Sequence, residues 1–195
     1  ICHSLIKMEH KTNLKGGETG GFYEQEITFQ YSDAVIMISR SELSHYISFG
    51  YDKYQAVPIV IYNSYKPKLD NIEWWPDYGL NHIGYIGRHV PRKRPDLPIT
   101  AVERSGKKDA RVFNMGVDYR GTTGNPFWED LGKKHPRQLV IIPFSSNKET
   151  VRFYWNSIGA NCITGIYEPF GYTMCETLDR RVQAIVQNIE GPKEI

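Results

Sequence analysis

Short apolar blocks rich in β-branched residues alternate along this chain with segments whose apolar residues follow helical spacing. The clearest block covers residues 33–39 and has polar residues on both sides, which is typical of a buried strand in a parallel sheet. A helix-like segment at 22–31 precedes it, and residues 41–47 follow it with helical spacing that ends at Gly50. Because strand and helix alternate, the sequence predicts an α/β fold with parallel sheets.

The alternation is interrupted at 63–81, where prolines, two adjacent tryptophans and several charges show no period. We therefore expect a partial N-terminal lobe at 1–66, a linker at 67–81 and a C-terminal lobe at 82–195. The remaining strands are expected at 57–62, 82–86, 110–115, 139–144 and 161–166, the remaining helices at 96–104, 148–157 and 171–180, and a last apolar block at 184–186.

Charge and composition narrow the class of protein. The 195 residues include 24 Lys and Arg against 22 Asp and Glu, so the net charge of +2 favours neither a nucleic-acid nor a membrane surface. The longest apolar run, at 139–144, is far shorter than the roughly 20 residues of a membrane helix. The first residues show no signal-peptide features, and three cysteines without paired spacing favour free thiols. We therefore expect a cytoplasmic protein without a transmembrane segment.

Two carboxylates, Glu168 and Glu176, lie eight positions apart across an expected strand-to-helix turn. Gly171 between them lets the backbone approach a ligand, and the N–H groups at the start of the next helix favour phosphate or developing negative charge. In this interpretation, one carboxylate stands near each end of a bound ligand. An ordinary helix start with one favourable acid and one surface Glu explains the same spacing equally well.

A glycine and a basic loop follow the strand expected at 82–86. Arg88 offers a planar fork for phosphate oxygens, and Lys93 offers a mobile point charge. Ligands of open α/β sheets bind at the ends of strands, so the position suits a small anion. A solvated basic loop or a nucleic-acid patch is the alternative, and a second anion site in the same lobe favours the small anion.

These segments resemble segments of the retaining GT-B glycosyltransferases and follow one another in the same order as in that family. The type includes sucrose synthase, sucrose-phosphate synthase and bacterial glycosyltransferase family 4. The run from Glu168 to Glu176 looks like the Glu-x7-Glu motif of that family. Several segment matches in the family's order are more specific evidence than a single motif match. The resemblance implies a GT-B-like fold with two Rossmann-like lobes, the N-terminal one incomplete, and a chain that spans about the middle of a typical member. The further matching segments are 3–5, 32–39, 60–63, 87–93 and 191–195.

The resemblance implies a donor-binding role for the basic loop and for the helix after it. Gly87, Arg88 and Lys93 would lie at the donor diphosphate, and Glu176 would bind the nucleotide ribose. Backbone amides near the helix start would hold sugar and phosphate, and they belong to Phe170, Gly171 and Tyr172.

The resemblance also implies catalytic groups. Glu168 would contact hydroxyl groups of the transferred sugar, and His3 corresponds to an N-terminal-lobe histidine beside that sugar. Arg88 and Lys93 would stabilise the leaving group. The expected reaction moves a hexose of the glucose or mannose type from UDP-, GDP- or ADP-hexose to an unidentified acceptor, with retention and without cofactor or metal.

Two residues depart from the family pattern: Arg181 stands where the family has a glycine, and Gln183 where it has a proline. Tight packing of the last predicted helix on the sheet, which the family pattern implies, is therefore not expected here. The departure motivates an alternative function, a catalytically degenerate GT-B protein that binds nucleotide sugar or a protein partner without transfer. A nucleic-acid-binding module is a weaker alternative, because the basic pairs are scattered. The sequence leaves open the donor base, the acceptor, catalytic competence and the oligomeric state.

Overall fold

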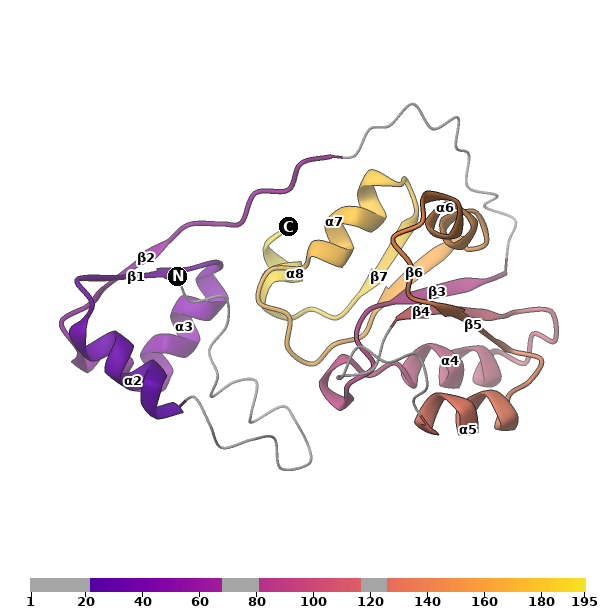
Figure 1. Ribbon diagram of the computed structural model, residues 1–195, viewed down its shortest axis with the longest axis horizontal. Coiled ribbons are helices and arrows are strands. Elements are labelled where there is room, and N and C mark those ends of the chain that lie inside the picture. The colour runs from indigo at the N-terminus through magenta and orange to yellow at the C-terminus, as the bar shows by residue number, and fades with distance from the viewer. Residues whose placement is uncertain (1–21, 68–80, 117–125) are drawn as a thin grey trace. The chain divides into compact units, whose positions relative to one another are not determined.

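The computed structural model of the protein describes residues 22–67, 81–116 and 126–195 (Figure 1). The described residues form two compact units. The chain passes between these units more than once, so neither is continuous in sequence. Unit 1 contains the described residues up to 65 together with 166–171 and 187–195, and unit 2 contains those in 66–165 and 172–186.

Unit 2 is built on a five-stranded sheet in which neighbouring strands run parallel. The strand order is β5-β4-β3-β6-β7, so β3 and β6, which are far apart in sequence, lie side by side. Helices connect the strands, as parallel pairing requires. The strands are β3 (Ile83–Ile86), β4 (Val112–Gly116), β5 (Leu139–Pro143), β6 (Ala160–Ile163) and β7 (Gln183–Val186), and the helices are α4 (Leu97–Ser105), α5 (Pro126–Lys134), α6 (Lys148–Asn156) and α7 (Tyr172–Asp179).

Helices cover both faces of the unit 2 sheet, with α4 and α5 on one side and α6 and α7 on the other (Figure 1). All residues of β4 and β6 are buried, and both strands are mainly apolar, although each contains one buried asparagine. Tyr154 and Trp155 of α6 pack with Met115 of β4. Ile99 of α4 packs with Val112 in a second cluster. The inner strands are therefore stabilised by apolar burial on both faces.

Unit 1 is built around a two-stranded parallel sheet. Its core is a cluster of aromatic rings in which Phe29 lies 5.1 Å from Tyr46 and 5.0 Å from Tyr51, between ring centroids, in edge-to-face contacts. Tyr167 is fully buried in the same cluster, so this core needs a residue from late in the chain. The elements are α2 (Phe22–Tyr31), β1 (Ala34–Met37), α3 (Arg40–Ser48), the 3-10 helix η1 (Tyr51–Lys53), β2 (Val57–Val60) and α8 (Glu190–Glu194).

Helix α3 begins at a capping arrangement that the local sequence supplies. The side chain of Ser39 accepts a hydrogen bond from the N–H of Glu42 (3.1 Å), and Glu42 Oε2 accepts one from the N–H of Ile38 (2.9 Å). This Ser-x-x-Glu pairing satisfies backbone donors that have no partner within the helix. The strand-to-helix turn after β1 is therefore defined by residues 38–42 themselves.

The structure confirms the predicted α/β fold class with parallel sheets, and it contains the strands and helices that the described residues were expected to form. Two helices, α5 and α8, are not predicted by the sequence pattern. The domain boundaries expected around 67–81 stay a prediction, since residues 68–80 lie outside the described residues. Two segments after that boundary, 166–171 and 187–195, belong to unit 1.

The end of α7 corrects one expectation. Arg181 adopts a left-handed φ of 56°. Its N–H donates to the carbonyl of Leu178 (2.9 Å), and the N–H of Val182 donates to that of Thr177 (3.1 Å), which are the two bonds of a Schellman motif. Val182 is only 2% exposed, so the helix end packs tightly, which the sequence did not predict. Arg181 adopts the conformation for which glycine is better suited.

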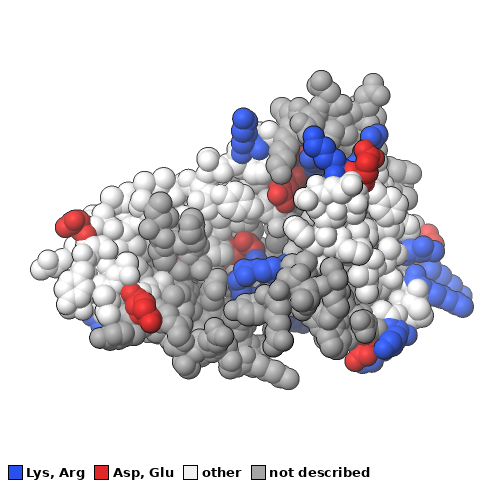
Figure 2. All heavy atoms as spheres, viewed as in Figure 1, with Lys and Arg blue, Asp and Glu red and all other residues white. Residues whose placement is uncertain are grey.

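The face of the molecule shown in Figure 2 carries charged side chains of both signs. On the face shown in Figure 2, Lys and Arg are interspersed with Asp and Glu, and the described residues form no continuous basic area there. Such an area is the usual footprint of nucleic-acid binding. In the part of the chain that the structure describes, no helix has the length and apolar character needed to cross a membrane.

Candidate functional site

The strand order of unit 2 predicts where a ligand binds. After β3 the chain forms β4 and β5 on one side of β3, and then β6 and β7 on the other side. The connections that leave the carboxyl ends of β3 and β6 therefore diverge. In open α/β sheets, ligands bind where two such connections diverge. Residues 87–93 leave β3 at this point, and Thr164 begins the connection that leaves β6.

The basic loop 87–93 is anchored to the sheet through its backbone. The N–H of Gly87 donates to a carbonyl of β4 (3.1 Å), and the Tyr85 hydroxyl donates to the carbonyl oxygen of Arg88 (2.9 Å). The loop ends in a 3-10 turn, η2 (Pro91–Lys93). The Arg88 residue is exposed and Lys93 is half-buried. The loop therefore has a defined backbone from which the Arg88 guanidinium reaches solvent.

A polar contact inside the sheet holds the same loop. Nε2 of His89 lies 2.8 Å from Oδ1 of Asn114, a fully buried residue of β4. The His89 ring also lies against the ring of Tyr85, with 6.1 Å between centroids. The sequence analysis did not single out this contact. An asparagine within an apolar strand was the available signal, because a buried amide needs a hydrogen-bond partner.

The basic loop and the chain leaving β6 are joined directly. The Thr164 hydroxyl lies 2.9 Å from the carbonyl oxygen of Lys93 and 2.8 Å from that of Arg94. The Arg94 guanidinium forms two hydrogen bonds with Asp96, of 3.0 and 2.8 Å. These bonds hold the pKa of Asp96 below its ordinary value. Lys93 is thus fixed at the edge of the sheet where the two connections diverge.

Helix α7 carries Tyr172 and Glu176 one turn apart on the same face. A buried hydrogen-bond chain holds this helix on β6: the Tyr154 hydroxyl donates to Asn161 Oδ1 (2.6 Å), and Asn161 Nδ2 donates to Thr177 Oγ1 (2.8 Å). Burial raises the pKa of Tyr154 well above its ordinary value, so its hydroxyl remains a donor at neutral pH. The register of α7 on the sheet is therefore specified by polar contacts.

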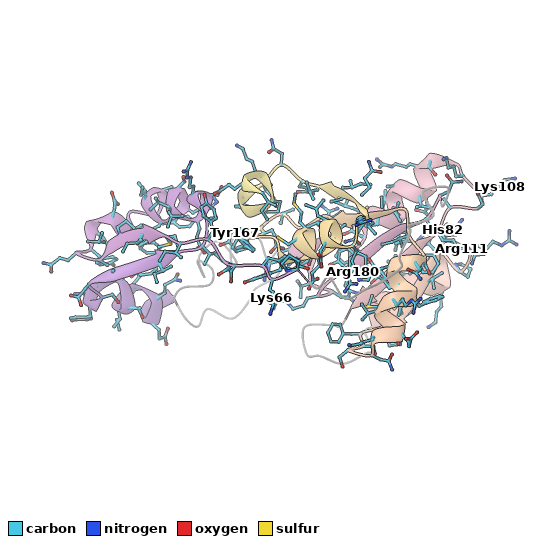
Figure 3. The ribbon with its side chains drawn as sticks, turned by 90° about the horizontal axis from the view of Figure 1, so that it is seen from above. Lys66, His82, Lys108, Arg111, Tyr167 and Arg180 are labelled. Atoms are coloured by element: carbon cyan, nitrogen blue, oxygen red, sulfur yellow. The ribbon has the colours of Figure 1, made fainter. Side chains whose placement is uncertain are left out.

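Three residues predicted to lie at the sugar, Glu168, Phe170 and Gly171, belong to unit 1. Tyr167, which precedes them, is fully buried, and its ring centroid lies 6.4 Å from that of His45 (Figure 3). Phe170 is only 8% exposed, and Gly171 has a φ of 108° that residues with a Cβ rarely adopt. Buried neighbours therefore define the backbone on both sides of Glu168, whose own side chain is half-exposed.

The predicted site residues thus fall into two groups. One group lies at the carboxyl edge of the unit 2 sheet and on α7, and the other lies in the 166–171 segment of unit 1. His3 lies outside the described residues, so its role stays a prediction. The first group contains Gly87, Arg88, Lys93, Tyr172 and Glu176, and the second contains Glu168, Phe170 and Gly171.

The opposite edge of the unit 2 sheet also carries basic side chains. His82, Lys108 and Arg111 lie near the amino ends of β3 and β4 (Figure 3). Because ligands of open α/β sheets bind at the carboxyl ends of strands, we assign these residues no binding role.

Neither metal ligands nor reactive thiols mark another site in the described residues. There, no group of three or more His, Cys, Asp or Glu side chains is arranged to hold a metal ion. Cys162 and Cys175 are free thiols, as expected. Burial raises the pKa of Cys162 to about 11 and also raises the pKa of Cys175. Both thiols therefore stay protonated at neutral pH and are poor nucleophiles.

Sequence comparison identifies no relatives, since no protein-family profile and no curated protein matches the chain. Solved structures do match. Sucrose-phosphate synthase from Thermosynechococcus elongatus has a TM-score of 0.73 at 16% identity, covering 98% of this chain and 50% of that one. TarM from S. aureus has a TM-score of 0.71 at 17% identity, covering 94% and 36%. HepE from Anabaena, solved with UDP and glucose, has a TM-score of 0.68 at 16% identity, covering 86% and 48%.

These similar proteins are glycosyltransferases of the GT-B class, which have Rossmann-like lobes with parallel sheets. The two units described above therefore form part of a GT-B-like fold. At 16–17% identity the likeness concerns the fold. The chain spans between 36% and 50% of the length of these structures.

Proposed function

We propose that this chain belongs to a retaining GT-B glycosyltransferase of the family 4 type, which transfers a hexose from a nucleotide-sugar donor. The observation that carries the proposal is the contact of the Thr164 hydroxyl with the carbonyl oxygens of Lys93 and Arg94. This contact joins the basic loop to the chain leaving β6 at the switch point of the sheet, where doubly wound folds bind nucleotides. The similar protein HepE was solved with UDP and glucose, which supports the same ligand class.

Arg88 and Lys93 are proposed to bind the donor diphosphate. Breaking the anomeric bond leaves additional negative charge on the nucleoside diphosphate, so stabilising that charge lowers the barrier. A guanidinium binds two phosphate oxygens at once, and an ammonium adds a point charge. The first N–H groups of α7 supply a further partial positive charge. With these groups at the diphosphate, the proposed reaction requires neither a cofactor nor a metal ion.

Glu168 and Glu176 are proposed to bind the two sugars of the donor. A carboxylate accepts hydrogen bonds from two neighbouring hydroxyl groups, which suits both a hexose and a ribose. We assign the transferred hexose, of the glucose or mannose type, to Glu168 and the ribose to Glu176. His3 is proposed to lie beside the hexose, and the amides around Gly171 to hold sugar and phosphate.

The experiment that tests this proposal is calorimetric titration of the 195-residue chain with UDP, GDP and ADP and with their glucose and mannose conjugates, with and without EDTA. We expect one nucleotide to bind selectively, and EDTA to leave the affinity unchanged. Binding of none of these compounds would contradict the donor-site assignment.

Turnover separates the enzyme from a degenerate protein that binds nucleotide sugar without transfer. Release of the nucleoside diphosphate from the bound conjugate is the measurement. We expect Glu168→Ala to lower turnover by about 10²–10³-fold while donor binding changes little, since the interaction strengthens in the transition state. A wild-type chain that binds the conjugate without releasing the nucleoside diphosphate would support the degenerate alternative.

A further inference from the structure

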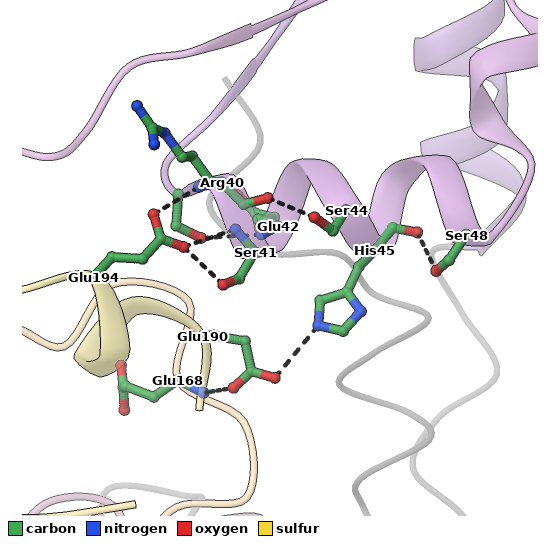
Figure 4. Close-up of polar contacts among 10 residues, drawn as sticks. Arg40, Ser41, Glu42, Ser44, His45, Ser48, Glu168, Glu190 and Glu194 are labelled. Atoms are coloured by element: carbon green, nitrogen blue, oxygen red, sulfur yellow. Dashed lines mark hydrogen bonds and ion pairs between the residues drawn. The ribbon is translucent and has the colours of Figure 1, made fainter. Parts of the chain in front are cut away.

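One carboxylate binds the last described segment to the beginning of α3. Glu194 accepts hydrogen bonds from the N–H of Arg40 (2.9 Å) and from the N–H and the hydroxyl of Ser41 (both 2.7 Å) (Figure 4). The Tyr62 hydroxyl donates a fourth bond (2.8 Å). A carboxylate at this position satisfies N–H groups that have no partner within the helix and interacts favourably with the helix dipole. Helix α8 is thereby held on α3.

A second carboxylate of α8 reaches the backbone of Glu168. The Glu190 side chain is only 11% exposed, and its Oε1 lies 3.3 Å from Nε2 of His45. The other oxygen, Oε2, lies 3.4 Å from the backbone nitrogen of Glu168. The N–H of Gly191 donates to the carbonyl oxygen of Glu168 (3.0 Å). Residues 190–191 therefore hold both backbone polar groups of Glu168, while the Glu168 carboxylate points away from Glu190 (Figure 4).

The close approach of these two backbones needs a glycine. A Cβ on Gly191 would lie 2.2 Å from the carbonyl oxygen of Phe170 and 2.3 Å from its Cα. A larger residue would therefore force the 168–170 backbone away. Glu190 itself has a φ of 21°, at the edge of the left-handed region. Such strain persists where surrounding contacts hold the residue in place.

We propose that Glu190 is a positioning residue for Glu168 and that His45 orients Glu190. This inference rests on the proposed function, in which Glu168 binds the transferred sugar. Glu190 acts through the backbone from which the Glu168 carboxylate extends. His45, in the last turn of α3, restrains rotation of the Glu190 carboxylate by contacting its other oxygen. Misplacing a reacting group by about 1 Å costs up to ~10²-fold in rate, so the pair affects turnover more than donor affinity.

The test uses the full 195-residue chain as wild type and as Glu190→Ala, Glu190→Gln and His45→Ala. A second His–Glu pair, His135 with Glu103 in unit 2, supplies a matched control in Glu103→Ala. Three quantities are measured for each. They are hydrogen exchange at the amides of Glu168 and Gly191 by NMR, the kcat and KM for release of nucleoside diphosphate from UDP-, GDP- and ADP-glucose, and the affinity for UDP, GDP and ADP by calorimetry.

We expect Glu190→Ala to accelerate exchange at both amides and to lower kcat by about 10- to 100-fold while KM stays within about twofold. His45→Ala should have the same effects to a smaller extent. Glu190→Gln should restore most of kcat, because its amide oxygen accepts from the Glu168 N–H and its NH₂ donates to the ring nitrogen of His45. Glu103→Ala should resemble wild type in all three quantities.

Two results are decisive against the inference. Wild-type exchange and wild-type kcat in Glu190→Ala would show that its carboxylate does not position Glu168. An equal loss of kcat in Glu190→Gln and Glu190→Ala would remove the hydrogen-bonding role. If wild type binds none of the nucleotides and releases none, the proposed function fails and the catalytic part of this inference with it. The amide exchange then still shows whether Glu190 holds the loop, so the two failures are distinguishable.

Discussion

The two units bury their strands to different degrees. In unit 2, β4 and β6 are buried along their whole length. In unit 1, Val57 and Ile59 of β2 are 58% and 44% exposed. Apolar burial on both faces therefore stabilises the inner strands of unit 2, whereas Ile185 of its edge strand β7 is 48% exposed. The two-stranded sheet of unit 1 buries less and depends more on individual contacts.

Those individual contacts join residues that are far apart in the sequence. Glu194 binds Arg40 and Ser41 across 154 and 153 positions, and His45 contacts Glu190 across 145. Unit 2 also contains long-range strand pairs, but many side chains share the burial there. We therefore expect a single polar substitution in unit 1 to remove a larger fraction of the free energy of unfolding of its unit than one in unit 2. Substitutions in the two units should therefore differ in their effect on the free energy of unfolding.

Trp155→Ala should have the largest effect on stability. Trp155 is 4% exposed and packs in the core of unit 2 at 5.0 Å from the Tyr154 ring, between centroids. Removing a buried aromatic side chain costs about 3–5 kcal/mol. Urea unfolding followed by tryptophan fluorescence and circular dichroism measures the change. Phe153→Ala, at a position 56% exposed on the same helix, is the control and should cost far less. Equal costs would contradict the assignment of the core.

Arg88→Ala should weaken binding of the nucleoside diphosphate without unfolding either unit. Hydrogen bonds to charged groups contribute about 1.5–3 kcal/mol, which corresponds to roughly a 10- to 100-fold loss of affinity. Calorimetry measures the affinity. Arg104→Ala, which removes an exposed cation from the last turn of α4, is the control. Similar losses in the two variants would indicate a general charge effect, whereas a loss confined to Arg88→Ala would assign diphosphate binding to the basic loop.

Glu194→Gln should lower the stability of unit 1 by about 1 kcal/mol at neutral pH, as expected for loss of a charged group at a helix start. Burial by itself raises the pKa of Glu194, but hydrogen bonds from Ser41, the Arg40 amide and Tyr62 lower it further, so the folded pKa lies below the ordinary value of 4.5. A depressed carboxyl pKa stabilises the fold above the unfolded pKa, and this contribution is lost as pH falls through the folded value.

The difference between wild type and Glu194→Gln should therefore be largest near pH 7 and shrink below about pH 4.5. Urea unfolding at several pH values measures this dependence. Glu24→Gln, which changes an exposed acid of α2, is the control. A pH-independent difference would contradict the stabilising role of the ionised carboxylate.

Arg181→Gly should increase stability slightly. Relief of the strained left-handed backbone conformation raises the free energy of unfolding by about 1–2 kcal/mol. The greater conformational freedom of glycine in the unfolded chain lowers it by about 0.5–1 kcal/mol. The expected net gain is at most ~1 kcal/mol, measured as a rise in the urea midpoint. Arg180→Gly is the control, since Arg180 has no positive φ and should lose stability. A loss in both variants would contradict the strain at Arg181.

Much of the fold follows from local patterns in the sequence. Apolar blocks bounded by polar residues predict the strands, and capping residues such as Ser39 and Asn147 mark where α3 and α6 begin. Helices α5 and α8 were missed for local reasons as well. Gly132 lies within α5, and α8 has five residues that include adjacent Gly191 and Pro192. Such residues are poor helix formers, so only surrounding packing stabilises these helices.

The residues of the candidate site were also only partly predictable from the sequence. The sequence alone predicted the cations of the basic loop and the Glu168 to Glu176 segment as candidate site residues, because the residue types and their order along the chain are visible in it. It did not identify His89 and Asn114, or Glu190 as a partner of the Glu168 backbone. These contacts join residues from different elements, and periodicity carries no information about which elements meet.

The alternation of strands and helices can be predicted from the sequence, because burial and backbone propensity act over a few neighbouring residues. Three arrangements, by contrast, are visible only in the folded chain. Strand β3 pairs with β6, the Thr164 hydroxyl contacts the carbonyl oxygens of Lys93 and Arg94, and Glu190 contacts the backbone of Glu168. The physical reason is that these arrangements depend on how complete elements pack. Closing a loop of more than a hundred residues costs conformational entropy, which only the combined contacts of packed elements offset, so no short stretch of sequence reveals such a contact.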